Sequence, residues 1–134
     1  MRWAVLIVRI LVGVAFLLFG ADFFLHFIPK EGMPTPPPMA AGFIGALMST
    51  KYMTVVKILE LTGGFLVLTG RMAPLGLVLL VPVTVNIALW DAFLVEYKSG
   101  PPIGTVLLVL EIFLLLAYRR YFAPVFTTSA TPGF

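Results

Sequence analysis

Long hydrophobic runs, separated by short polar breaks, divide the chain into four stretches that suit membrane-spanning helices. These stretches cover about residues 3–28, 52–69, 73–95 and 102–118. A hydrocarbon core about 30 Å thick takes roughly 20 apolar residues as a helix, and backbone polar groups in lipid must be bonded within their own segment. The strict alternation of apolar and polar residues that is typical of a transmembrane barrel strand is missing. We therefore predict an all-α membrane protein, a bundle of four transmembrane helices.

The polar breaks carry turn residues, Gly70-Arg71 in one case and Ser99-Gly100-Pro101-Pro102 in the other. The connection over residues 29–51 is longer. Its proline-rich first half predicts an extended outer loop, and its apolar second half, residues 40–49, predicts a short helix at the membrane interface, with a re-entrant segment as the alternative. Residues 1–121 thus form a single transmembrane domain. Residues 122–134 are predicted to be a flexible or partner-bound tail.

Composition excludes several classes of protein. Only 11% of the 134 residues are charged, against roughly 25% in a soluble domain, and the mean hydropathy is +1.08. The absence of cysteine excludes disulfides, thiol chemistry and cysteine-ligated clusters. A single histidine argues against a multi-histidine metal site, so we predict no metal and no cofactor held by the chain alone. A net charge of +3 at segment ends suits a lipid bilayer rather than a nucleic acid.

Basic residues gather unequally on the two sides of the predicted bundle. One side carries Arg2, Arg71, Arg119 and Arg120, and the other carries Lys30, Lys51 and Lys98. Cytoplasmic flanks of membrane helices are enriched in Lys and Arg. We therefore predict a multi-pass protein with both termini in the cytoplasm and the proline-rich loop outside.

Five polar side chains lie inside the apolar stretches: Arg9, Lys57, Glu60, Asn86 and Glu111. A charge at the centre of a membrane helix costs about 2.5–3.5 kcal/mol on insertion scales. A rise of about 1.5 Å per residue places all five in one band about 12 Å tall, and their formal charges cancel. We therefore predict that they form one polar network in the core. It either encloses a ligand pocket or fixes the register of the helices.

A second polar group falls near the outer interface. We interpret Asp22 and Asp91 as carboxylates that are solvated at the headgroup level. The alternative is a site that binds a cation between them. His26 lies at a similar level. We expect it to be hydrated or hydrogen-bonded rather than to ligate a haem or chlorophyll metal, because no second histidine exists.

Glycines accompany the polar residues at helical spacing. Gly13 and Gly20 share a face of the first stretch with Arg9, and small residues let neighbouring helices approach closely. We interpret Gly63-Gly64 as a packing notch.

The order and spacing of these motifs resemble the DoxX family of small bacterial membrane proteins, over about residues 9–121. The resemblance rests on Arg9-Ile-Leu-Val-Gly13, Phe19-Gly20, Phe43 to Thr50, Tyr52, Lys57-Ile-Leu-Glu60-Leu-Thr-Gly63-Gly64, Gly70-Arg71, Pro74-Leu75, Pro82, Val85-Asn86-Ile87, Leu110-Glu111 and Tyr118-Arg119. Where many members carry a His after the Asn of the third helix, this chain has Trp90-Asp91. The resemblance implies a location in the bacterial inner membrane and an association with redox or stress-response enzymes.

Three functions follow as hypotheses. The first is an accessory or assembly subunit of a larger membrane complex, redox-related, whose outer loop and tail contact other subunits. The second is a quinone-interacting oxidoreductase subunit in which the polar network binds a quinone carbonyl and relays protons. The third is transport of a small solute or proton, for which four spans would call for a homo-oligomer. Whether the chain is an enzyme stays open at this point.

Overall fold

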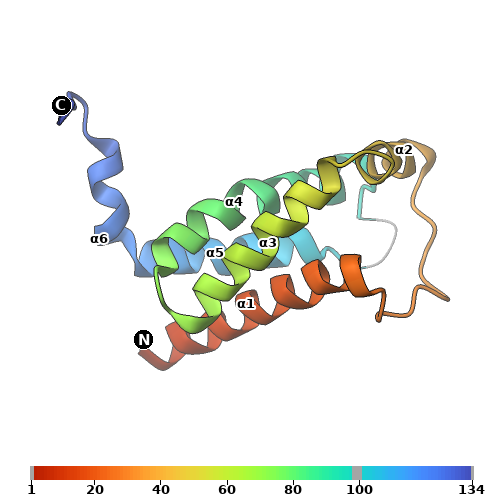
Figure 1. Ribbon diagram of the computed structural model, residues 1–134, viewed down its shortest axis with the longest axis horizontal. Coiled ribbons are helices and arrows are strands. Elements are labelled where there is room, and N and C mark those ends of the chain that lie inside the picture. The colour runs from red at the N-terminus through yellow and green to blue at the C-terminus, as the bar shows by residue number, and fades with distance from the viewer. Residues whose placement is uncertain (1, 98–100, 134) are drawn as a thin grey trace.

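The computed structural model describes residues 2–97 and 101–133, and the described residues form helices joined by loops, without a β-strand. Four helices run along the long axis: α1 (Arg2–Leu25), α3 (Tyr52–Thr69), α4 (Ala73–Leu89) and α5 (Ile103–Ala117). A short π-helix, η1 (Trp90–Leu94), continues α4, and α2 (Pro38–Met48) lies across the end opposite the termini (Figure 1). Successive long helices pack side by side, and α5 returns against α1 to close the bundle.

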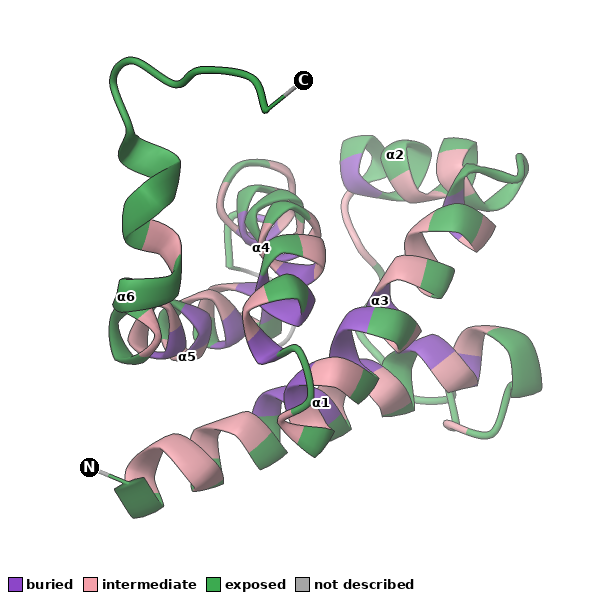
Figure 2. Cartoon of the chain, turned by 60° about the vertical axis from the view of Figure 1, so that its left-hand side comes forward, coloured by how far each residue is buried: buried purple, intermediate pink, exposed green. Residues whose placement is uncertain are grey.

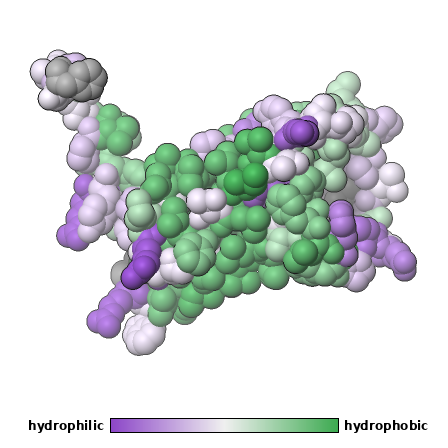
Figure 3. Space-filling model, in the orientation of Figure 1, coloured by the Kyte–Doolittle hydropathy of each residue, from purple (hydrophilic) through white to green (hydrophobic). Residues whose placement is uncertain are grey.

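Three of the helices are long and apolar enough to cross a membrane. They are Arg2–Leu25, Tyr52–Thr69 and Ala73–Leu94, the last including η1. Helix α5 is apolar but has only 15 residues, fewer than the roughly 20 of a full span. In the face of the molecule seen in Figure 3, hydrophobic side chains form a broad central belt with hydrophilic ones at both ends. The structure confirms the helical fold over the described residues, and three of the four predicted spans are long and apolar enough to cross a membrane.

The predicted bounds hold best for α3, which covers the stretch expected from the sequence. Helix α1 stops three residues earlier than predicted, because the Asp22 carboxylate accepts the backbone N–H of Ile28 at 2.7 Å and His26 takes a φ of 53°. Helix α2 begins two residues earlier than predicted, at Pro38. Proline is favourable there because the first turn of a helix needs no N–H donor.

The remaining boundaries differ in smaller ways. The third predicted span ends as the π-helix η1, and the fourth loses one residue at each end. Lys98 and the predicted turn at Ser99-Gly100 lie outside the described residues. The short helix α6 (Arg119–Phe122) leads into the tail, which begins with the 3-10 turn η2 (Ala123–Phe126). This segment projects from the bundle and is mostly exposed, although Phe122 packs against the core (Figures 1 and 2).

Glycines on α3 set how closely the helices pack. A Cβ on Gly64 would lie 3.1 Å from the Cβ of Phe16 on α1, whereas a Cβ on Gly63 would lie 2.6 Å from the Cγ of Leu80 on α4. Two adjacent glycines therefore face two different helices, which confirms the predicted packing notch. The apolar core lies around them and consists of Val12, Phe16, Val67, Leu77, Leu80, Leu107 and Leu114.

Helices α1 and α3 approach each other more closely at one end than at the other. A Cβ on Gly13 would lie 2.8 Å from the Cα of Leu68, so backbone meets backbone near the termini. Seven residues further along α1, a Cβ on Gly20 would first meet the side chain of Leu61, at 2.8 Å, and the backbone oxygen of Lys57 only at 3.5 Å. The helix pair therefore opens toward α2, and this opening makes room for a pocket.

Candidate functional site

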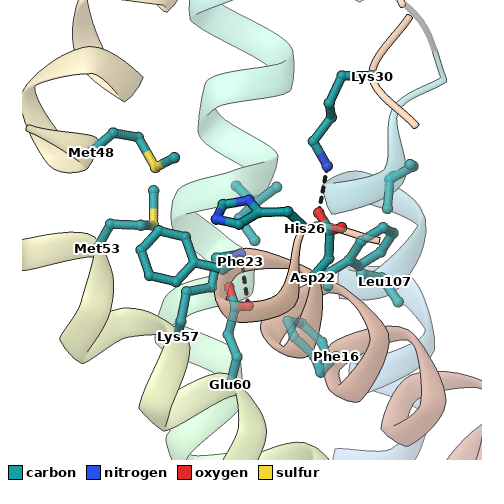
Figure 4. A pocket seen from close by; sticks show the side chains of 13 residues that line it. Phe16, Asp22, Phe23, His26, Lys30, Met48, Met53, Lys57, Glu60 and Leu107 are labelled. Carbon is teal, nitrogen blue, oxygen red and sulfur yellow. Dashed lines mark hydrogen bonds and ion pairs between the residues drawn. The ribbon is translucent and has the colours of Figure 1, made fainter. Parts of the chain in front are cut away.

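A hollow of about 350 Å³ lies where α1 and α3 diverge. Helices α1, α3 and α5 supply most of its wall, and α2, α4 and the loop after α1 complete it (Figure 4). We call it the aromatic pocket. Its lining residues are Phe16, Phe19, Asp22, Phe23, His26, Lys30, Met48, Met53, Lys57, Glu60, Ile87, Ile103 and Leu107.

The inner wall of the aromatic pocket carries an ion pair of a half-buried lysine and a buried carboxylate. Lys57 and Glu60 lie three residues apart on α3, and the Lys57 Nζ is 3.0 Å from the Glu60 Oε2. The Glu60 side chain is only 2% exposed and that of Lys57 is 18% exposed. The spacing predicted one shared face, and the structure confirms it. This pair brings a cation and a carboxylate to the inner end of the hollow, beside aromatic and aliphatic side chains.

The mouth of the pocket carries a second ion pair, between Lys30 and Asp22. The Lys30 side chain is 62% exposed, whereas Asp22 as a residue is buried. The other Asp22 oxygen accepts the Ile28 N–H, so both carboxylate oxygens have partners within the protein. The interpretation of Asp22 as a solvated interfacial carboxylate is therefore wrong. The residue ends α1 and folds the following loop back over the pocket.

Asp91 has a separate structural role. It lies on η1, is 6% exposed, and its Oδ2 accepts the backbone N–H of Thr105 in the first turn of α5 at 3.2 Å. First-turn N–H groups have no partner within their own helix, so Asp91 joins η1 to α5 instead of being solvated as we expected. Within the described residues no hydrogen bond joins it to Asp22, and no group of three or more metal-ligating side chains occurs.

His26 lines the aromatic pocket from the end of α1. In Figure 4 its ring lies between Met48 and Met53 on one side and the Asp22–Lys30 pair on the other. The residue is exposed, and a neutral imidazole offers one donor and one acceptor nitrogen. It can therefore contribute a polar contact to a molecule bound near the mouth.

Glu111 lies apart from the pocket, inside the bundle. It is fully buried on α5, and its Oε1 lies 2.9 Å from the hydroxyl of Thr84 on α4. That hydroxyl is also 2.9 Å from the carbonyl of Leu80, and Glu111 Oε2 has no hydrogen-bond partner within the described residues. We did not predict Thr84. Its position one turn after Leu80, on the buried face of α4, was the available signal, because a buried hydroxyl needs a partner.

Arg9 lies at the other end of the bundle. Its Nε donates to the carbonyl of Val67 at 3.1 Å, and its Nη1 contacts the Tyr118 hydroxyl at 3.4 Å. The Val67 carbonyl is one of the last four of α3, which have no partner within the helix. A Cβ on Gly70 would lie 2.5 Å from the Arg9 Nη2, so the guanidinium covers the turn after α3. Arg9 therefore caps α3 and does not contact the buried carboxylates.

Asn86 is exposed, and its amide donates to the carbonyl of Pro82 at 2.9 Å rather than to a core residue. Its partner therefore lies on its own helix, one turn earlier. The prediction of one network of five residues is wrong for the described chain. Lys57 and Glu60 pair, Glu111 pairs with Thr84, and the other two residues lie elsewhere.

A second hollow, of about 410 Å³, shares Met53, Lys57, Glu60 and Ile87 with the aromatic pocket. We call it the α2 groove, because α2, α3 and α4 form it. Its lining residues are Phe43, Ile44, Leu47, Tyr52, Met53, Val56, Lys57, Glu60, Pro82, Val83, Asn86, Ile87 and Trp90. Lys57 and Glu60 therefore line both hollows, and they are the only charged residues of the α2 groove within the described chain.

No family model, curated protein or solved structure matches this chain. The geometry of the site therefore carries the functional argument. It combines phenylalanine and aliphatic walls, two adaptable methionines, and a buried Lys57–Glu60 pair that can donate hydrogen bonds and hold a proton. Such a site suits a flat amphipathic molecule with polar atoms on an apolar ring.

Proposed function

We propose that this chain is a membrane subunit of a larger redox complex and binds a quinone-class molecule in the aromatic pocket. The observation that carries the proposal is the buried Lys57–Glu60 pair on the wall of a hollow otherwise lined mainly by aromatic and aliphatic side chains. Small-molecule sites are mostly apolar, contain a few placed polar groups, and enclose about 300–1,000 Å³. The aromatic pocket fits this description at about 350 Å³.

The lining residues supply the contacts that a quinone needs. Its ring would pack against Phe16 and Phe23, and its apolar tail would leave through the hydrophobic belt. The Lys57 ammonium has three N–H donors, of which Glu60 takes one, so others remain for a quinone carbonyl. Reduction to the quinol takes two electrons and two protons. A partner subunit would supply the electrons, and Glu60 is placed to pass protons toward the ring.

The proposal includes a four-span topology in the bacterial inner membrane, with both termini in the cytoplasm. Helix α5 would be the fourth span, since a bilayer thins around a short hydrophobic helix at modest cost. All five arginines lie in the sequence near the helix ends that share a side with the termini: Arg2, Arg9, Arg71, Arg119 and Arg120. That bias supports the orientation. The location and the redox partner are part of the proposal, and they were suggested by the resemblance of the helix motifs to the DoxX family in the sequence.

Binding of a short-chain ubiquinone, ubiquinone-1, to the full chain in lipid nanodiscs tests the proposal. We expect saturable binding, and we expect Glu60→Gln to weaken it about tenfold. Without the carboxylate the Lys57 ammonium is no longer held at the quinone carbonyl, and a hydrogen bond to a charged group contributes about 1.5–3 kcal/mol. Glu31→Gln is the matched control, since it removes the same charge from an exposed loop residue that does not line the pocket. Absence of saturable binding, or equal affinities of the two variants, would contradict the proposal.

A second candidate function is a purely structural subunit that binds its partner through the tail and needs no ligand. The observation in its favour is the projecting segment η2, in which Val125 is 76% and Phe126 is 81% exposed. Native mass analysis of mildly solubilised membranes separates the two. If a partner co-purifies with the chain and is lost from Phe126→Ser, while ubiquinone-1 does not bind, the structural role is correct and the quinone site is not.

A further inference from the structure

A third hollow lies at the end of the bundle that carries both termini. It encloses about 390 Å³ between the first turns of α1 and the last turn of α5. Arginine, aromatic and aliphatic side chains line it, among them Arg2, Trp3, Leu6, Arg9, Ala117 and Tyr118. We call it the basic groove. It is separate from the aromatic pocket, with which it shares no residue.

The two arginines of the basic groove lie on one face of α1, two helical turns apart. Arg9 is held in place by the Val67 carbonyl and the Tyr118 hydroxyl, which occupy its Nε and Nη1. Its Nη2 makes no hydrogen bond within the described residues. The groove is therefore lined by one guanidinium that two hydrogen bonds hold in place, and by a second, exposed one on Arg2.

No acidic side chain lies in the segments that make up this end. Residues 1–21, 61–90 and 112–134 contain neither Asp nor Glu. Arg71 belongs to the same end, and so do Arg119 and Arg120. An excess of positive charge in such a groove attracts an anion from outside the protein.

We propose that the basic groove binds the phosphate of an anionic membrane phospholipid. Guanidinium groups match phosphate oxygens as paired donors, and basic pockets between membrane helices bind anionic headgroups. Leu6 and Ala117 provide apolar wall for the glycerol and the first carbons of an acyl chain. Trp3 is 71% exposed beside the groove, as expected of an aromatic anchor at the headgroup level. These apolar contacts favour a lipid phosphate over free phosphate.

The test measures lipid binding by native mass spectrometry of the full chain in detergent. Dioleoyl phosphatidylglycerol is the anionic probe, dioleoyl phosphatidylethanolamine is the zwitterionic one, and sodium phosphate tests the free anion. We expect preferential retention of phosphatidylglycerol. Arg2→Gln should weaken this retention about fivefold, since one arginine near an anionic surface contributes about 1 kcal/mol. Sodium phosphate at millimolar concentration should leave it unchanged.

Arg71→Gln is the matched control, because it removes the same charge from the same end without touching the groove. It should retain phosphatidylglycerol as the wild type does. Ala117→Phe fills the groove without changing charge and should lower retention as Arg2→Gln does. Equal losses in Arg71→Gln and Arg2→Gln, full retention in Ala117→Phe, displacement by sodium phosphate, or no preference between the two lipids would each overturn the proposal.

Discussion

The two ends of the bundle are built from the same helices but differ in charge and in packing. At the end near the termini, arginines occur without acidic residues, and α1 meets α3 backbone to backbone at Gly13. At the opposite end, lysines pair with carboxylates, Lys30 with Asp22 and Lys57 with Glu60, and the helices separate around a hollow. Polar residues in one apolar helix can therefore have different roles, depending on whether they lie where the helices are closed or open.

The largest expected effect concerns the buried ion pair at the open end. Lys57→Met leaves the Glu60 carboxylate buried without its cation, and breaking a buried pair in this way costs about 3–5 kcal/mol of unfolding free energy. The mouth pair is exposed on its lysine side, so Lys30→Met should cost less than about 1 kcal/mol. Reversible unfolding in bicelles measures both. Equal losses of unfolding free energy in Lys57→Met and Lys30→Met would contradict the distinction between the two ion pairs.

The next effect concerns the closed end of the α1–α3 interface. Gly13→Ala places a methyl group against the backbone of Leu68, and overpacking of this kind costs about 1–3 kcal/mol. Gly20→Ala should cost less, because the first group it meets is the movable side chain of Leu61. The same unfolding measurement compares them. Gly45→Ala on α2 is the control, because its Cβ meets nothing within 4 Å. A larger loss of unfolding free energy in Gly20→Ala than in Gly13→Ala would contradict the closer packing of α1 and α3 at Gly13.

A comparable or somewhat smaller effect is expected where Arg9 caps α3. Arg9→Met leaves the buried Val67 carbonyl without its donor, which should lower the unfolding free energy by about 1–3 kcal/mol. Arg71→Met removes an exposed arginine of the same end and should change stability by less than about 0.5 kcal/mol. Hydrogen exchange at the end of α3 should rise in the first variant only. Unchanged exchange there would exclude the capping role.

The smallest effect concerns the link between η1 and α5. Asp91→Ala removes the acceptor of the Thr105 N–H and should cost about 1 kcal/mol. Asp91→Asn keeps an acceptor oxygen in that place. It should lower the unfolding free energy by only about a few tenths of a kcal/mol, as exchanges among good capping residues do. Thermal unfolding of the two variants measures the difference. A larger loss for Asn than for Ala would show that the charge of Asp91, rather than its acceptor oxygen, matters there.

Helix positions and small-residue contacts could be predicted from the sequence, because hydrophobic length and spacing report on both directly. The bounds of α3, the Gly63-Gly64 notch and the shared face of Lys57 and Glu60 are examples. The partners of the other polar residues could not. The rise along a helix predicts the level of a side chain but not the helix that it faces. Arg9 and Asn86 were therefore placed in the core, and the hydroxyl of Thr84 was overlooked.

The pocket at the open end is tested most directly by photolabelling the full chain in nanodiscs with an azido-quinone and mapping the labelled peptides. We expect labels within residues 16–26 and 53–60, which line the aromatic pocket, and we expect excess ubiquinone-1 to remove them. Labels on the lipid-facing surface or at the arginine end, or labels that excess ubiquinone-1 does not compete, would contradict quinone binding at the Lys57–Glu60 pair.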